Sequence, residues 1–279
     1  MSHFNALANT WWDVNGPQRI LHKMNLLRMD FINETIKAHL PLNFDATSPE
    51  EEVYIPCYNL DLLPENVRNA ILQEQETKRT AMVKTMRLSA LDIGCGGGIL
   101  TESMGRMPWI SHVKGIDLST EVLAVAKSHK ELDPMLSEKV SYELKPVEDI
   151  PVEEKYDVVT MFEMLEHVNY PSEVLTQALS RVNPGGWVFI STINRDFVSW
   201  FTTIFMGEHV LNVVPVGTHT YDKYINESEI RNWMADTKQG VAQFKVASSK
   251  GCVYMPLYGW KFTDSPHVGN YFMAIQRLL

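Results

Sequence analysis

Two clusters of residues have the types and spacing that chemistry requires. The first lies in residues 88–102, LSALDIGCGGGILTE, where an apolar run enters a group of glycines and a helix-like pattern follows. A strand, a tight turn and a helix N-terminus in this order form the ligand-binding edge of open α/β sheets. Gly94, Gly96 and Gly98 lack a Cβ atom, so the backbone can turn sharply and approach a ligand closely. The run therefore predicts a binding site for a nucleoside-bearing cofactor.

Two acidic residues narrow the choice of cofactor. Asp92 lies within the end of the first strand, and Asp117 follows 23 residues after Gly94, at the end of the next apolar run. A carboxylate at the second position suits a ribose diol, which S-adenosylmethionine (SAM) and NAD both carry. SAM has no pyrophosphate and does not require the full phosphate-binding fingerprint. We therefore predict that Asp92, Gly94, Gly96 and Asp117 bind SAM, with a purely structural glycine turn as the alternative.

The second cluster is Glu163, Glu166 and His167, directly after the fourth predicted strand. If this segment is helical, the three side chains lie on one face at i, i+3 and i+4. Two oxygen ligands and one nitrogen would leave open positions on a divalent metal for a catechol, whose phenol pKa the metal would lower. Carboxylates favour Mg²⁺ or Mn²⁺, and the histidine also accepts Zn²⁺ or Fe²⁺. Glu163 and His167 are thus the candidate catalytic residues.

Two other interpretations of this cluster stay open. His167 alone could act as a general base, because the unperturbed pKa of histidine is near 6.5. The set could also be a solvated helix start, where acidic side chains interact favourably with the helix dipole.

A regular alternation of strands and helices positions both clusters. Parallel strands with right-handed crossovers are expected from this spacing, and two late strands without an intervening helix predict an antiparallel hairpin. We therefore predict the class I SAM-dependent methyltransferase fold, an α/β Rossmann-like, seven-stranded sheet with a C-terminal antiparallel hairpin. The predicted strands are 88–93, 112–117, 139–144, 156–161, 186–192, 241–248 and 270–276, and the predicted helices of this region are 99–107, 119–130, 171–182 and 226–236.

The sequence of the first third of the chain predicts three helices and a loop. A first helix carries Phe4, Leu7 and Ala8, and a second has an apolar stripe at Ile20, Met24, Leu27 and Phe31. A loop over 41–60 and a mostly polar helix from about residue 63 to 86 follow. We predict an N-terminal helical lid and insertion over 1–87, and a SAM-dependent methyltransferase domain over 88–279.

An apolar excursion over 195–225 interrupts the methyltransferase domain. Phe197, Trp200, Phe201, Ile204 and Phe205 recur at helical spacing and form an aromatic stripe. The stripe is too short to span a bilayer, and it predicts an interfacial helix or the wall of a tunnel for an apolar substrate. A helix packed on the protein's own core is the alternative.

Composition excludes several classes of protein. Lys and Arg number 25 and Asp and Glu number 34, so the net charge is −9, which argues against a nucleic-acid partner. The three cysteines, Cys57, Cys95 and Cys252, lack CxxC spacing and are expected to be reduced thiols. No apolar stretch reaches the roughly 18 residues of a membrane span.

The sequence resembles the O-methyltransferases of ubiquinone biosynthesis. The resemblance rests on the glycine motif, on EMLEHV (residues 163–168), on WWD (11–13), LHKMN (21–25) and STINR (191–195), and it covers about His3 to Leu279. Residues 199–207 and 269–277 look most similar to the fungal mitochondrial form. The resemblance implies methylation of ring hydroxyls on 3,4-dihydroxy-5-polyprenylbenzoate and on demethylubiquinol.

The resemblance also implies roles for individual residues. SAM contacts fall on Arg28, Gly94, Asp117 and Phe162, a position where relatives often have methionine. From the sequence alone, Arg28 could instead lie on a solvent-exposed face of its helix. The mitochondrial branch implies a divalent metal held by Glu163, Glu166 and His167, with Mg²⁺ preferred and Zn²⁺ or Mn²⁺ as alternatives. The long spacing from Arg28 to Gly94 is expected to reflect a branch-specific insertion over 41–86.

Further expectations concern location and partners. The family implies a peripheral protein on the matrix side of the mitochondrial inner membrane, in a complex with other ubiquinone-biosynthesis proteins and in contact with the membrane surface. A mature or truncated chain is expected, because no presequence precedes residue 1. Two other functions stay open: methylation of a soluble catechol or phenol, and a SAM-binding scaffold of a biosynthetic complex.

Overall fold

One mixed sheet organises the part of the chain that the computed structural model describes, residues 10–16, 18–42, 47–56, 59–204, 217, 220–236, 243–255 and 258–279. Within this part, eight strands follow one another in the order β3-β2-β1-β4-β5-β8-β6-β7. The strands are β1 (Leu88–Ile93), β2 (Ile110–Asp117), β3 (Val140–Leu144), β4 (Tyr156–Phe162), β5 (Val182–Ile193), β6 (Phe244–Met255), β7 (Gly259–Thr263) and β8 (Asn270–Arg277).

The five parallel strands confirm the predicted α/β core. β1 lies in the middle and pairs with both β2 and β4, so the strand order reverses between β1 and β4. Ligands of open α/β sheets bind beside such a reversal, at the carboxyl ends of the strands. Asp92 stands opposite Gly115 on one side and Thr160 on the other. The predicted glycine turn therefore follows the central strand.

The antiparallel end of the sheet is larger than the sequence indicated. β8 pairs antiparallel with both β5 and β6, as the predicted C-terminal hairpin requires. However, the segment between β6 and β8 forms a further strand, β7, which pairs antiparallel with β6 at the sheet edge. The seven-stranded prediction missed β7, whose five residues, GWKFT, offer too short a run to show a clear strand alternation.

Helices cover both faces of the sheet, as crossover connections require. Adjacent strand residues alternate between two cores: Ala90 and Val158 face one cluster, and Leu91 and Val159 face the other. On the first face lie α2 (Arg19–Ala38), α4 (Ile99–Gly105) and α5 (Thr120–Lys130); on the second lie α7 (Pro171–Ser180) and α9 (Glu227–Asp236). The short helix α6 (Pro134–Ser137) precedes β3.

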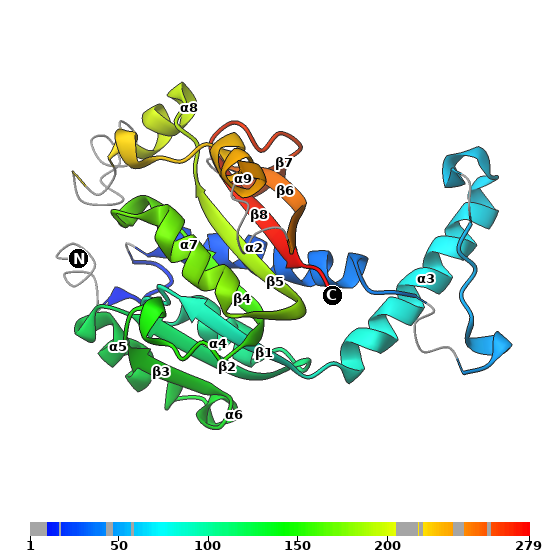
Figure 1. Ribbon diagram of the computed structural model, residues 1–279, viewed down its shortest axis with the longest axis horizontal. Helices are drawn as coiled ribbons and strands as arrows, with labels where there is room; N and C mark the ends of the chain where they lie inside the picture. Colours follow the sequence, from blue (N-terminus) through cyan, green and yellow to red (C-terminus); the bar gives the residue numbers. More distant parts are fainter. Residues whose placement is uncertain are drawn as a thin grey trace.

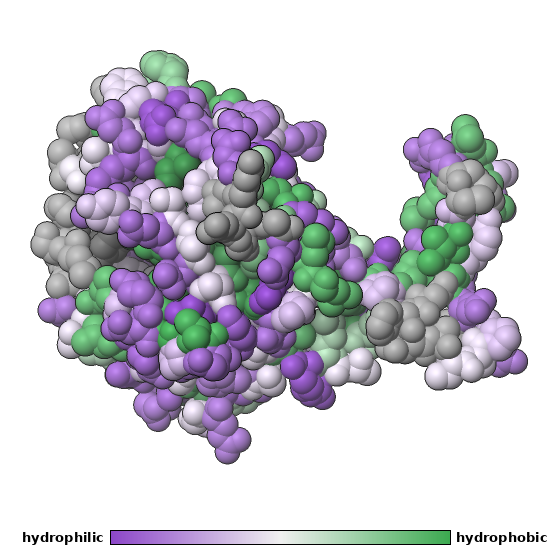
Figure 2. All heavy atoms as spheres, in the orientation of Figure 1, coloured by the Kyte–Doolittle hydropathy of each residue, from purple (hydrophilic) through white to green (hydrophobic). Residues whose placement is uncertain are grey.

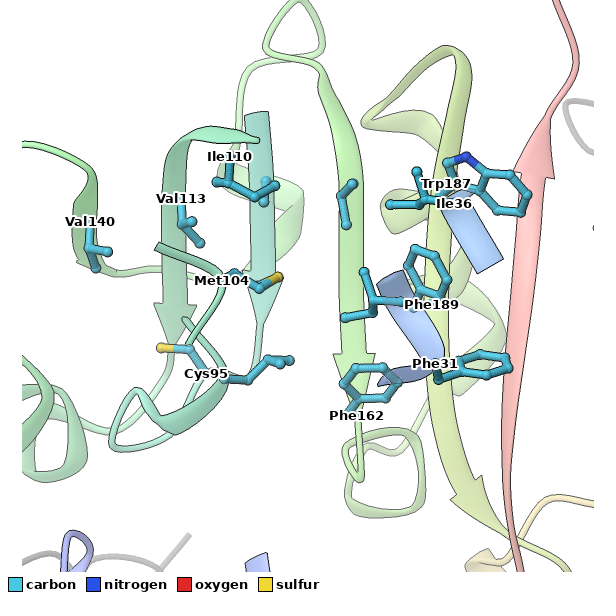
Figure 3. Close-up of a cluster of buried hydrophobic side chains, with 14 of the residues drawn as sticks. Phe31, Ile36, Cys95, Met104, Ile110, Val113, Val140, Phe162, Trp187 and Phe189 are labelled. Carbon is cyan, nitrogen blue, oxygen red and sulfur yellow. The ribbon is translucent and has the colours of Figure 1, made fainter. Parts of the chain in front are cut away.

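Helix α2 is held against the sheet by aromatic side chains. Phe31 contacts Phe189 of β5 and Phe272 of β8, with ring centroids 5.9 and 5.6 Å apart. Figure 3 shows Phe31, Phe162 and Phe189 gathered in this core. The predicted apolar stripe of α2 is confirmed, since Met24 and Phe31 are almost completely buried. This packing fixes α2 over the carboxyl end of β4.

Helix α3 (Glu65–Thr85) projects away from the sheet as an arm (Figure 1). It confirms the helix predicted to end near residue 86, and Gln75 is its one buried residue. The arm also carries the short 3₁₀ turns η2 (Pro49–Glu51) and η3 (Leu60–Leu62). Apolar residues lie exposed among hydrophilic ones on it (Figure 2).

The remaining described elements are short. They are the 3₁₀ turns η4 (Val147–Asp149), η5 (Leu165–His167) and η7 (Tyr221–Lys223), and helix α8 (Phe197–Ser199). Over the described ranges, none of the helices is both long enough and apolar enough to cross a membrane. The predicted first helix with Phe4 to Ala8, and Phe205 with the residues up to 216, lie outside the described residues.

Candidate active site

The loop between β1 and α4 is a tight, glycine-rich turn. Gly94, Gly96 and Gly98 have φ angles of 73°, 53° and 89°, in the left-handed region that glycine adopts at little steric cost. The amide N–H groups of Gly94 and Cys95 both donate to the carbonyl oxygen of Ile116, at 2.9 and 3.0 Å. These bonds tie the turn to the end of β2. The structure thus brings the predicted cofactor residues of both strands together.

Asp117 completes this junction. Its carboxylate accepts one hydrogen bond from the amide of Gly96 and another from the amide of Ser119, each at 2.9 Å. A carboxylate offers about four lone-pair sites, so Asp117 keeps capacity to accept from the hydroxyls of a ribose. The side chain is only half-buried, which leaves those sites within reach of a ligand.

Asp92 lies below the turn, deep in the protein. Its buried carboxylate accepts hydrogen bonds from the hydroxyls of Thr101 in α4, at 2.6 Å, and Thr160 in β4, at 2.8 Å. Burial raises the pKa of Asp92 to about 6, although the two hydroxyls favour the charged form. Asp92 therefore joins the helix after the turn to the neighbouring strand, and a direct contact with SAM stays a prediction.

Arg28 of α2 is a buried cation beside this edge. Its guanidinium carbon lies 5.3 Å from the ring centroid of Phe162, and one terminal nitrogen donates to the sulfur of Met24 at 3.6 Å. Its Nε atom has no hydrogen-bond partner in the structure. Burial lowers the pKa of Arg28, and the charges of Glu163 and Asp92 oppose that shift. The structure thus rejects the solvated-face interpretation, and the guanidinium is suited to receive an anionic group.

The turn after β4 is strained. Within the described residues, Glu163 is the one non-glycine residue with a φ angle in the left-handed region, at 52°. Strained backbone of this kind often marks functional sites. The Glu163 carboxylate accepts hydrogen bonds from the hydroxyl of Ser191 in β5, at 2.7 Å, and from the amide of Asn270 in β8, at 3.2 Å. These two strands therefore hold the side chain at the sheet edge.

Glu166 and His167 follow in η5 and differ in environment. Glu166 is buried and accepts a hydrogen bond from the hydroxyl of Thr192 at 2.7 Å, and burial raises its pKa to about 7. His167 is more exposed. Partial desolvation lowers the pKa of His167, and the charge of Glu163 opposes this shift.

The expectation that these three residues share one helical face is wrong. The segment forms a single 3₁₀ turn over Leu165–His167, and Glu163 precedes it in a left-handed conformation. Across the described part of the chain, no three His, Cys, Asp or Glu side chains are arranged to hold a metal ion. Each carboxylate is bonded to a β5 hydroxyl instead. As placed, Glu163, Glu166 and His167 do not fit a divalent metal.

The excursion after β5 begins with an exposed aromatic helix. Asp196 caps it by accepting a hydrogen bond from the amide of Ser199 at 2.9 Å, and a π-helical turn continues from α8 to residue 204. The side chains of Phe197, Trp200 and Phe201 are 73%, 39% and 41% exposed. The aromatic stripe is therefore not packed on the protein's own core over these residues.

A cavity of about 400 Å³ lies beside η5, at the base of the excursion. Arg195 and Tyr224, near the two ends of the excursion, contribute to its wall, as do Val168 and Trp233. Apolar side chains line part of it, and the charged side chains of Arg195, Asp222, Lys223 and Glu229 line the rest together with Asn169 and Ser172. Its volume lies within the range of small-molecule sites.

Sequence reasoning missed several residues that hold the site. Thr101 and Thr160 position Asp92, and Ser191 and Thr192 position the two glutamates. Ser191 and Thr192 could have been found from the sequence, because they are consecutive polar residues at the carboxyl end of an apolar strand, where ligand sites form. Asn270 gives no such signal, since only the pairing of β8 with β5 brings it to Glu163.

The fold and the turn define a class I SAM-dependent methyltransferase. Residues 55–240 match the family described as "Methyltransferase domain". A solved plantazolicin methyltransferase, in complex with a pentazolic desmethylPZN analog and SAH, has a similar fold, with a TM-score of 0.52 and 18% identity over 72% of this chain and 80% of that one.

Sequence relatives define the family more narrowly. The chain is 62% identical to a mitochondrial ubiquinone biosynthesis O-methyltransferase of Candida albicans, over 100% of this chain and 84% of the relative. It is 50% identical to the protein of the same name in Saccharomyces cerevisiae, over 100% of this chain and 87% of the relative. The chain belongs to the ubiquinone biosynthesis O-methyltransferase family, which confirms the family predicted from the sequence motifs.

Proposed function

We propose that this protein transfers a methyl group from SAM to a ring hydroxyl of a polyprenylated catechol in ubiquinone biosynthesis. The observation that carries the proposal is the junction of glycine turn, Asp117 and buried Arg28 at one sheet edge, beside a second cluster of acidic residues. The acceptors proposed from the family are 3,4-dihydroxy-5-polyprenylbenzoate and demethylubiquinol.

SAM occupies the glycine turn in this proposal. Asp117 accepts from the ribose hydroxyls, and Gly94 and Gly96 allow the ligand to approach the backbone. Arg28 pairs with the carboxylate of SAM, which would give its buried guanidinium the anionic partner that the described side chains do not supply. Phe162 holds the guanidinium from the other side through its ring face.

The chemical step is a direct in-line displacement. The acceptor hydroxyl loses its proton, its oxygen forms a bond to the SAM methyl carbon, and the carbon–sulfur bond breaks to leave S-adenosylhomocysteine. We propose Glu163 and His167 as the groups that take up the proton, because both follow β4 at the edge where the turn lies. Fixing the two reactants in line lowers the entropic part of the barrier.

Metal dependence stays a prediction from the family resemblance, with Glu163, Glu166 and His167 as ligands of Mg²⁺, Zn²⁺ or Mn²⁺. Both carboxylates would have to exchange their hydroxyl partners, Ser191 and Thr192, for the ion. A bound divalent ion would lower the pKa of a catechol hydroxyl. No step above depends on it. Isothermal titration with Mg²⁺ and with Zn²⁺, in wild type and in Glu163→Gln, tests metal binding without relying on turnover.

The polyprenyl tail gives the aromatic helix and the cavity a function. A lipid-bound acceptor requires the active site to reach the membrane surface, and the exposed Phe197 and Phe201 suit insertion into an interface. The cavity beside η5 is proposed to receive the first part of the tail along its apolar side, which Leu165, Val168 and Trp233 line. The excursion over 195–225 is then the membrane and substrate element of the domain 88–279, with 1–87 as lid and insertion.

The names of the mitochondrial relatives support a mitochondrial location. We propose peripheral attachment to the matrix side of the inner membrane, and membership of a complex with other ubiquinone-biosynthesis proteins. The exposed apolar residues of the α3 arm are available for such contacts.

Methyl transfer from labelled SAM to a short-chain prenylated catechol tests the proposal. We expect turnover of the prenylated catechol at a higher kcat/KM than that of the same catechol without a tail. Equal kcat/KM values would support a soluble acceptor instead. SAM binding without turnover of either acceptor would support a scaffold.

A further inference from the structure

The N-terminal segment places two tryptophans directly on the glycine turn. The indole Nε1 of Trp12 donates a hydrogen bond to the carbonyl oxygen of Gly97 at 2.9 Å. Trp11 is buried over the neighbouring backbone, and a Cβ atom added to Gly97 would lie 2.2 Å from its ring. The absence of side chains at Gly96 and Gly97 thus makes room for Trp11, and Trp12 bonds the carbonyl of Gly97, which the bonds from β2 do not reach.

The ring face of Trp12 is held as well. Its ring stacks on the imidazole of His129 in α5, with centroids 3.4 Å apart and planes 1° from parallel. The His129 ring lies 2.9 Å from the carboxylate of Glu102, which is fully buried in α4 and also accepts from Arg106 at 3.2 Å. Because α4 begins directly after Gly98, the contacts from Gly97 through Trp12 and His129 to Glu102 connect the turn to the helix that follows it.

We propose that Trp12 is a positioning residue for the SAM-binding turn. A turn of consecutive glycines loses more conformational entropy on ordering than any other segment of its length. The bonds from Ile116 and Asp117 order its first half, and the bond from Trp12 orders its second half, at Gly97. Ordering before binding strengthens affinity, since the ligand no longer bears that cost. This inference rests on the proposed function, because it assumes that SAM occupies the turn.

The test is isothermal titration with SAM on the full chain and two tryptophan variants. Trp12→Phe keeps a ring against His129 and removes the indole N–H. Trp260→Phe is a matched control, because the Trp260 indole also donates to a backbone carbonyl, that of Ile20 at 3.1 Å, away from the turn. We expect Trp12→Phe to raise the Kd for SAM about three- to tenfold, and Trp260→Phe to change it less than about twofold.

Kinetics distinguish a positioning role of Trp12 from a general effect on stability. Trp12→Phe should raise the KM for SAM in step with its Kd and leave the KM for the acceptor unchanged. A second variant, His129→Gln, removes the ring under Trp12 and should raise the Kd for SAM in the same direction without touching the turn itself. If wild type, Trp12→Phe and His129→Gln had equal Kd values for SAM, the inference would be overturned and the proposed function would stand. Equal increases of the Kd in Trp12→Phe and Trp260→Phe would have the same consequence. A wild-type chain that bound no SAM would overturn the proposed function and this inference together.

Discussion

Replacing Arg28 with methionine should weaken SAM binding without lowering the stability of the ligand-free protein. Arg28 is 9% exposed, none of the described carboxylates forms an ion pair with it, and its Nε atom lacks a hydrogen-bond partner. A buried charge in this state costs free energy until a ligand neutralises it. Methionine fills much of the same space without a charge, so Arg28→Met removes that cost together with the cation–π contact to Phe162.

Arg28→Met should change the affinity for SAM and the stability of the ligand-free protein in opposite directions. Hydrogen bonds to charged groups contribute about 1.5–3 kcal/mol, so the Kd for SAM should rise roughly 10- to 150-fold. The melting temperature of the free variant should equal or exceed that of wild type, and the increase caused by saturating SAM should shrink. Titration calorimetry and thermal melts with and without SAM measure both. A free variant that melts more than about 5 °C lower, with an unchanged Kd, would show that Arg28 is a structural residue and refute the reasoning.

Three further predictions concern other parts of the site. The pKa of Asp92 is raised from 3.8 to about 6, so its contribution to stability is fully present below pH 4 and is lost as the pH rises through 6. The free energy of unfolding of Asp92→Asn should therefore rise by about 2.4 kcal/mol relative to that of wild type between pH 4 and pH 7, with about half of this rise above pH 5. Urea unfolding at several pH values measures this, and a pH-independent difference would contradict it. Val168→Trp should fill part of the cavity and raise the KM for a prenylated catechol, while that for the tail-free catechol stays unchanged; Val152→Trp, at an exposed position, is the control. A similar rise for both acceptors would show that the cavity does not hold the tail. Phe197→Ser with Phe201→Ser should weaken binding to lipid vesicles about 10- to 100-fold with an unchanged melting temperature, because both rings are exposed. Unchanged co-sedimentation with vesicles would argue against the aromatic helix as the membrane contact.

The sequence was sufficient for the parallel core and the cofactor edge. The apolar runs that end in Asp92 and Asp117 are strands, because a buried parallel strand needs apolar residues on both faces. The glycine spacing also predicted the turn, since positive φ angles at Gly94, Gly96 and Gly98 leave few other residues suitable. In these segments, local pattern and tertiary structure agree.

The details of the second cluster depended on long-range contacts. A segment EMLEH has the spacing of a helical face, yet Glu163 is left-handed and its carboxylate accepts hydrogen bonds from Ser191 and Asn270 instead. Those partners lie 28 and 107 residues away, so no window around Glu163 contains them. For the same reason the sequence of α2 did not predict that Arg28 is buried. Its burial depends on the packing of α2 against Phe162 of β4.

A structure of the protein with bound S-adenosylhomocysteine tests the central claim most directly. The account predicts the ligand across the turn at Gly94 and Gly96, its ribose hydroxyls on Asp117, its carboxylate on Arg28, and its sulfur directed toward the side of Glu163 and His167. A ligand bound elsewhere, or bound at the turn with its carboxylate away from Arg28, would contradict the proposed arrangement of cofactor and acceptor.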